Sequence, residues 1–111
     1  MIWTAWNNGA HRRSGAGYGL KIPIENRDVH FVRSHGTVFL EVEGRSGVQE
    51  IEFNIDKESF WGPDCHELIK GEFGKWLIDQ GLAPWLKGHP PKFRISKIGE
   101  RRFRLEEVLA A

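Results

Sequence analysis

The segment TVFLEVEGRSGVQEIEFNI (residues 37–55) alternates apolar and polar side chains in two runs that flank a glycine-bounded turn, GRSG. Apolar side chains at every second position are typical of a strand with one buried and one solvated face. The segment therefore predicts an antiparallel hairpin, and its glycines suit the turn. The solvated face of this hairpin would carry four glutamates: Glu41, Glu43, Glu50 and Glu52.

The end of the chain repeats this pattern in KFRISKI (92–98) and RFRLE (102–106), which are joined by GER. Alternating apolar residues predict a second hairpin with basic side chains on its outer face. Such a row of cations could follow a phosphate backbone, and the alternative is a solvated face that prevents edge-to-edge aggregation. The outward positions hold Lys92, Arg94, Arg102 and Arg104.

The segment DKESFWGPDCHELIKGEFGKWLIDQG (56–81), between the hairpins, is predicted to be helical. Its apolar residues recur at spacings of three and four, which indicates one buried helix face. Pro63 suits a first helical position, and Gly71 and Gly74 indicate either two short helices or one kinked helix that another element approaches closely. Cys65 falls on the apolar face and is predicted to be buried and inert.

Three further strands are predicted before the first hairpin, at IWTAW (2–6), YGLKIPI (18–24) and VHFV (29–32). The resulting order of elements contains no β-α-β alternation. A chain of 111 residues is expected to form one domain. We therefore predict a single α+β domain, residues 1–111, with a curled, mostly antiparallel, barrel-like sheet and one kinked helix or two short helices.

The chain has five tryptophans, and exposed ones could stack on nucleic-acid bases. Trp76 lies on the apolar helix face, and Trp61 and Trp85 flank the helical segment, so these three are expected to pack against the core. Trp3 and Trp6 have opposite parity on a strand, so one of them is expected to be exposed.

The glycine-rich stretch NNGAHRRSGAGYGLKI (7–22) matches neither a dinucleotide-binding fingerprint nor a P-loop. A strand is predicted after it, so no helix N-terminus is available there to hold a phosphate. Glycines expose backbone N–H groups and arginines donate to phosphate or carboxylate, which favours an anion-gripping loop. The alternative is a flexible surface connection. The candidate contacts are His11, Arg12, Arg13, Ser14 and Tyr18.

Charge is distributed unevenly along the chain, although the formal net charge is only +1. Residues 41–72 include nine acidic and three basic residues, whereas residues 87–104 include seven basic residues and one acidic residue. The surface would be polarised if the fold placed these segments on different faces. One cysteine, no long apolar run and no recognisable secretory signal predict a cytoplasmic protein without a membrane partner.

Sequence motifs for catalysis are sparse. Cys65, His66 and Glu67 are consecutive, so on a helix their side chains would diverge, and no metal site, catalytic residue or cofactor is predicted. An active site built from His11, Tyr18 and a distant acid remains an alternative, because residues that are neighbours in space need not be close in sequence.

The motifs WNNGAHRRSGAGYGLKI, SFWGPDCHEL and GLAPWLKGHPPKFRISKIGERRFRL together resemble a small bacterial protein family with no assigned activity. The C-terminal third, GKWLIDQGLAPWLKG followed by a hairpin ending in RFRL, is similar to B3-like DNA-binding pseudobarrels. The glycine-aspartate step of those domains is replaced here by APWLKG, so the resemblance implies no binding residues.

The sequence therefore predicts a non-enzymatic binding domain whose basic side contacts nucleic acid or a phosphorylated ligand. The first alternative is a protein-interaction module or homodimer that uses the acidic face of the first hairpin. A small enzyme acting on a phosphorylated molecule is the second alternative. The leading hypothesis depends on Arg12 and Arg13 lying beside Arg102 and Arg104.

Overall fold

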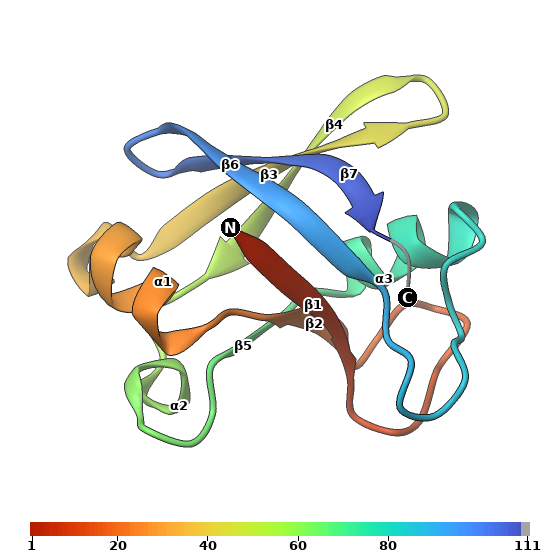
Figure 1. Ribbon diagram of the computed structural model, residues 1–111, viewed down its shortest axis with the longest axis horizontal. Helices are drawn as coiled ribbons and strands as arrows, with labels where there is room; N and C mark the ends of the chain where they lie inside the picture. The colour runs from red at the N-terminus through yellow and green to blue at the C-terminus, as the bar shows by residue number, and fades with distance from the viewer. Residues whose placement is uncertain (110–111) are drawn as a thin grey trace.

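The computed structural model describes residues 1–109, whose seven strands form one mixed sheet that curls into a half-barrel (Figure 1). The strand order is β4-β3-β7-β6-β1-β2-β5, and every neighbouring pair is antiparallel except β3 with β7. Three short helices complete the predicted α+β architecture. The elements are β1 (Ile2–Asn7), β2 (Tyr18–Lys21), α1 (Ile24–His30), the 3-10 turn η1 (Arg33–His35), β3 (Thr37–Gly44), β4 (Gly47–Asn54), α2 (Glu58–Trp61), β5 (Glu67–Ile69), α3 (Gly71–Asp79), β6 (Lys92–Gly99) and β7 (Arg102–Leu109).

Both predicted hairpins are confirmed. β3 and β4 pair along their whole length, and β6 pairs with β7 through a register that contains two irregularities. The period-two pattern places the predicted apolar residues in the core, because alternate side chains of a strand point to the same face. The buried side chains of these hairpins are Val38, Leu40, Val42, Ile51, Phe53, Phe93, Ile95, Phe103 and Leu105.

The prediction of a strand at VHFV (29–32) is wrong, and that of a strand over 18–24 is too long. Helix α1 occupies Ile24–His30 and follows directly on Pro23. Arg27 of this helix is buried, and its Nη1 donates hydrogen bonds of 2.8 Å to the carbonyls of both Phe60 and Gly62. A buried guanidinium needs such partners, so this tertiary contact favours a helix where the local pattern favoured a strand.

The segment predicted as helical (56–81) contains two short helices with strand β5 between them. Pro63 lies outside both helices and Cys65 is exposed, so both of those predictions are wrong. The free edge of β2 explains the difference, because Leu20 of β2 pairs with Leu68 of β5. Short apolar runs are ambiguous between helix and strand, and here the neighbouring strand decides.

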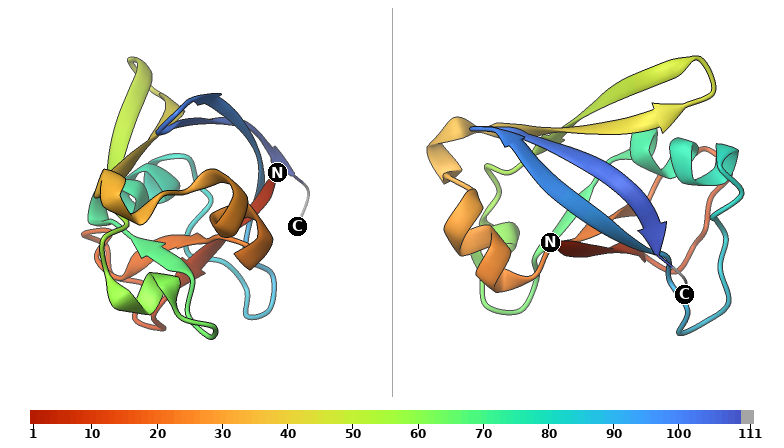
Figure 2. Two further views of the ribbon diagram at one scale, coloured as in Figure 1. Left: turned by 90° about the vertical axis from the view of Figure 1, so that its left-hand side faces the viewer. Right: turned by 45° about the horizontal axis from the view of Figure 1, so that its top comes forward.

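Helices α1 and α2 lie at one end of the curled sheet and α3 lies at the other (Figures 1 and 2). Phe73 and Trp76 of α3 stack with ring centroids 5.7 Å apart, and Trp76 Nε1 donates a 2.8 Å hydrogen bond to the Glu43 carbonyl. Gly74 is buried against Gly15 of the β1–β2 connection, so the close approach expected for a kinked helix occurs here in the second of two short helices. Helix α3 thus supports the connection that holds the candidate site.

Candidate functional site

The glycine-rich stretch forms the connection between β1 and β2, and local hydrogen bonds fix its backbone. Asn7 Oδ1 accepts hydrogen bonds from the backbone N–H groups of Gly9, at 2.7 Å, and His11, at 3.1 Å. The carbonyl of Arg12 accepts another from the N–H of Gly15 at 3.0 Å. His11 has a φ of 46°, which is uncommon outside glycine. The loop therefore adopts a specific conformation that places Arg12 at its exposed tip.

Three rings pack together beneath this loop. His11 Nδ1 lies 3.0 Å from the Tyr18 hydroxyl oxygen, and the Trp85 ring centroid lies 5.2 Å from that of His11 and 5.7 Å from that of Tyr18. Tyr18 is fully buried, and this burial raises the pKa of its phenol. Tyr18 therefore supports the loop from the core, and Trp85 packs against the core as predicted.

The connection between α3 and β6, residues 80–91, lies beside the β1–β2 connection, residues 8–17 (Figure 1). The contact between Trp85 and His11 joins the two loops. The Pro91 carbonyl also accepts a 2.9 Å hydrogen bond from the N–H of Ala5. Two segments distant in sequence thus form one surface, here named the basic end. Its exposed basic and histidine side chains are Arg12, Arg13, Lys87, His89 and Lys92.

The basic end has no acidic residue in either of its loops. The chain contains no aspartate or glutamate in residues 1–24 or in residues 80–99. Over residues 1–109, ion pairs connect six pairs of side chains, and none of the cations of the basic end takes part. Unpaired arginines and lysines that converge on one surface attract anions, phosphate groups in particular.

The basic face of the second hairpin differs because its arginines are paired. Arg104 donates two hydrogen bonds to Glu41 Oε2, from Nε at 3.0 Å and from Nη2 at 2.8 Å. These bonds raise the pKa of Arg104. Arg102 forms an ion pair with Glu50. The acidic and basic hairpin faces therefore lie side by side on one outer surface. Their charges pair with each other, so these two hairpins do not form the polarised surface that separate faces would have produced.

The register of β6 separates the predicted contact residues. Lys92 begins β6 at the basic end, where it pairs with Thr4, whereas Arg102 lies beside the hairpin turn at the other end of β6. Arg94 lies between them, and its Nε donates a 2.9 Å hydrogen bond to Glu107 Oε1, which raises the pKa of Arg94. The structure places Arg12 and Arg13 on the β1–β2 connection and Lys92 directly after the adjoining α3–β6 connection, and it leaves Arg102 and Arg104 on a different part of the sheet.

Ser14 has a local role, because its Oγ accepts a 3.3 Å hydrogen bond from the N–H of Ala16. Lys87 and His89 were missed as candidate contacts, since they lie in a proline-rich loop without a recognisable motif. The signal that could have found them is the absence of acids from both loop sequences. That absence becomes informative once the two loops are known to be neighbours.

A hollow of about 160 Å³ lies beside edge strand β5. Burial lowers the pKa of Lys57 there, and the charge of Glu67 opposes this change. Because one lysine faces one acid, the hollow offers less net positive charge to a phosphate than the basic end does. The lining residues are Trp6, Lys57, Ser59, Cys65, Glu67 and Ile69.

Comparison of the chain with protein-family models, with curated protein sequences and with solved structures gave no match. The resemblance to B3-like pseudobarrels therefore stays a prediction. In the part of the chain that the structure describes, no group of three or more His, Cys, Asp or Glu side chains is arranged to hold a metal ion. No helix in residues 1–109 is long and apolar enough to cross a membrane.

Proposed function

We propose that this protein is a non-enzymatic binding domain whose basic end contacts the phosphates of a nucleic acid. The observation that carries the proposal is that two adjoining loops contain no acid, whereas exposed cations lie on both of them or directly after them: Arg12, Arg13, Lys87 and Lys92. Guanidinium groups form paired hydrogen bonds with phosphate oxygens, and lysines add mobile positive charge.

The shape of the basic end favours nucleic acid over a small phosphorylated molecule. Its cations are exposed and belong to two different loops, so they suit several phosphates along a backbone. Each phosphate that is neutralised releases counterions, and the affinity therefore increases with the number of contacts. A small phosphorylated ligand is the alternative, and we expect it to compete only weakly with a nucleic acid.

The enzyme alternative requires His11 and Tyr18 to share a site with a carboxylate. The hydrogen bond of the His11 ring goes to Tyr18, and Tyr18 is fully buried beneath the loop. Within residues 1–109, no ion pair connects His11 to an acid. This arrangement supports a role in positioning the loop more than a role in catalysis.

The test is binding of labelled single-stranded and duplex DNA and RNA, measured by fluorescence anisotropy at about 50 and 200 mM salt. The variant Arg12→Ala/Arg13→Ala is expected to weaken binding. It should also reduce the slope of log affinity against log salt by about 1 for each phosphate contact that is lost.

The matched control is Arg102→Ala/Arg104→Ala, which removes the same formal charge from the ion-paired outer surface. Its affinity and salt slope are expected to stay close to those of the unmodified protein. Equal losses in the two double variants would overturn the assignment to the basic end. The absence of salt-sensitive binding to every probe would overturn the proposed function itself.

A further inference from the structure

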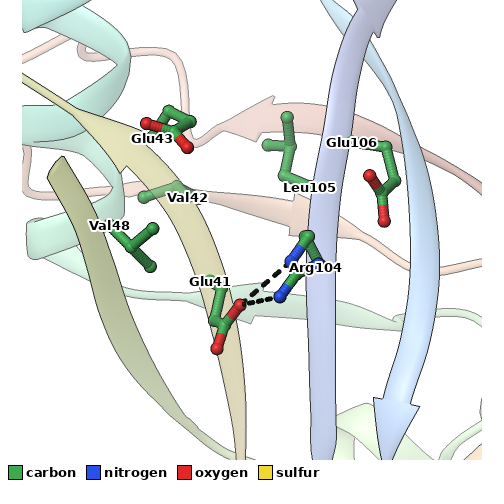
Figure 3. A pocket seen from close by; sticks show the side chains of 7 residues that line it. All are labelled: Glu41, Val42, Glu43, Val48, Arg104, Leu105 and Glu106. Atoms are coloured by element: carbon green, nitrogen blue, oxygen red, sulfur yellow. Dashed lines mark hydrogen bonds and ion pairs between the residues drawn. The ribbon is translucent and has the colours of Figure 1, made fainter.

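β3 and β7, the parallel pair of the sheet, separate after a short stretch of pairing. Their register ends at Glu41 with Arg104, although β3 continues to Gly44 and β7 continues to Leu109. Figure 3 shows the two strands apart beyond the Arg104–Glu41 ion pair. Beyond that pair, the edges of β3 and β7 that face the gap do not pair with each other.

A β-bulge in β7 accounts for this separation. Ile95 of β6 pairs with Leu105, but Arg94 pairs with Glu107, so Glu106 is an additional residue without a partner on β6. An additional residue in one strand bends that strand and increases its twist. The bulge therefore turns β7 away from β3 and places Glu106 next to the gap.

A hollow of about 100 Å³ occupies the gap on the outer surface of the sheet. Val42 and Leu105 are buried beneath it, whereas Val48 is 66% exposed. This volume is well below the usual range for ligand pockets, about 300–1,000 Å³, so the hollow suits one side chain of a partner more than a separate small ligand. The lining residues are Glu41, Val42, Glu43, Val48, Arg104, Leu105 and Glu106 (Figure 3).

The hollow has an excess of negative charge. Glu41 is engaged by Arg104, and the carboxylates of Glu106 and Glu43 lie close enough to raise the pKa of Arg104 further. Both of these carboxylates are exposed, and neither belongs to an ion pair of residues 1–109. Three carboxylates therefore surround one guanidinium, and a second cation would be attracted to the same place.

The free edge of β7 provides the second part of a binding surface. On the β3 side, the Glu43 carbonyl already accepts the hydrogen bond from Trp76. On the β7 side, Val108 is 45% exposed even though it pairs with the buried Phe93. Free N–H and C=O groups along a strand edge recruit an additional strand.

We propose that an extended, basic segment of a protein partner adds as a strand along the free edge of β7. A lysine or arginine of that segment would lie between Glu43 and Glu106, with its aliphatic part against Val48. A second copy of this chain that paired through the same edge is a poorer occupant, because the acidic edge would meet itself and like charges on paired strands repel. The acidic residues of this surface are not part of the basic end, although the β7 edge reaches Leu109, which pairs with Lys92. The inference uses different side chains from the proposed function and does not depend on it.

The test uses an array of labelled decapeptides in which lysine alternates with valine or threonine, each beside a version with glutamate in place of lysine. Binding by some lysine peptides and by none of the glutamate peptides is expected. Glu43→Gln/Glu106→Gln should weaken this binding about fivefold or more. The control Glu52→Gln/Glu58→Gln, which removes two exposed acids outside the hollow, should leave it unchanged.

Strand addition is distinguished from simple charge attraction by the backbone of the peptide. A lysine peptide with methyl groups on alternate backbone nitrogens is expected to lose binding, and the parent peptide should slow amide hydrogen exchange in residues 105–109. The proposal is overturned if no lysine peptide binds with a Kd below about 1 mM. Equal binding of the methylated peptide, or protection only elsewhere in the chain, would also overturn it.

Discussion

Gly74 in helix α3 lies directly against the backbone of Gly15, whose loop contains the arginines of the basic end. A Cβ atom at position 74 would overlap the Gly15 carbonyl oxygen and would lie 2.7 Å from the Cβ of Tyr18. The absence of a side chain at this position thus allows the helix to touch the loop. Through this contact, the core determines where Arg12 and Arg13 are presented.

Gly74→Ala is expected to lower the free energy of unfolding by about 1–3 kcal/mol, because the added methyl group has no space. The helix propensity of alanine would by itself stabilise the protein by about 1 kcal/mol relative to glycine. A loss of stability would therefore show that the steric overlap outweighs this gain. Gly71→Ala in the same helix is the matched control, since its Cβ would meet no atom closer than 3.9 Å. Gly71→Ala should leave the free energy of unfolding unchanged or raise it slightly. Urea denaturation measures both, and a Gly74→Ala protein of unchanged stability would contradict the packing described.

Tyr18 is expected to make stability fall at alkaline pH. Burial raises its pKa above the ordinary value of 10.0, so the folded protein keeps the phenol proton at a pH where the unfolded chain loses it. The stabilisation that the protonated Tyr18 phenol gives to the folded state is therefore complete below about pH 10, and it is lost as the pH rises above that value. Tyr18 is the one tyrosine in the sequence, so phenolate absorbance follows this group alone.

The control for this titration is Tyr18→Phe, whose stability should fall less steeply between about pH 10 and 11. A phenolate titration at the ordinary pKa in the folded protein would show that Tyr18 is not shielded from water. Equal pH slopes for the two proteins would assign the alkaline loss to other groups.

Arg27 is expected to contribute strongly to stability because its side chain satisfies backbone groups in the interior. Arg27→Met would leave the carbonyls of Phe60 and Gly62 without this donor and should lower the free energy of unfolding by about 2–4 kcal/mol. The control Arg33→Met breaks an exposed ion pair with Asp56 and should change the free energy of unfolding by less than about 1 kcal/mol. Thermal and chemical denaturation measure both variants. Equal losses of unfolding free energy in the two variants would contradict the role assigned to Arg27.

Cys65 is expected to react with an aromatic disulfide reagent in the folded protein, because its side chain is exposed. The rate should lie within about tenfold of the rate in denaturant, and Cys65→Ser should change stability by no more than about 0.5 kcal/mol. A thiol that reacted only on unfolding would instead support the buried position that the helical spacing predicted.

Local sequence pattern decides some elements of this fold, and neighbouring elements decide others. Alternation in residues 37–55 and 92–106 fixes which side chains face the core, and both hairpins formed as predicted. The run from Cys65 to Ile69 fits a helix or a strand equally well, and the unpaired edge of β2 selected the strand. Helix α1 takes up Val29 and His30, the first half of VHFV, and the buried hydrogen bonds of Arg27 stabilise this helix against the local strand pattern.

By itself, the sequence determined the α+β class, the two hairpins, and the inward and outward faces of their strands, because these follow from the period of a single strand. Only the tertiary structure decided which charges cancel. It set Glu41 beside Arg104 and Glu50 beside Arg102, and it placed the connection that contains Lys87 beside the connection that contains Arg12 and Arg13. Electrostatic interaction depends on distance in space, and the distances between segments far apart along the chain are set by the order in which the strands join the sheet.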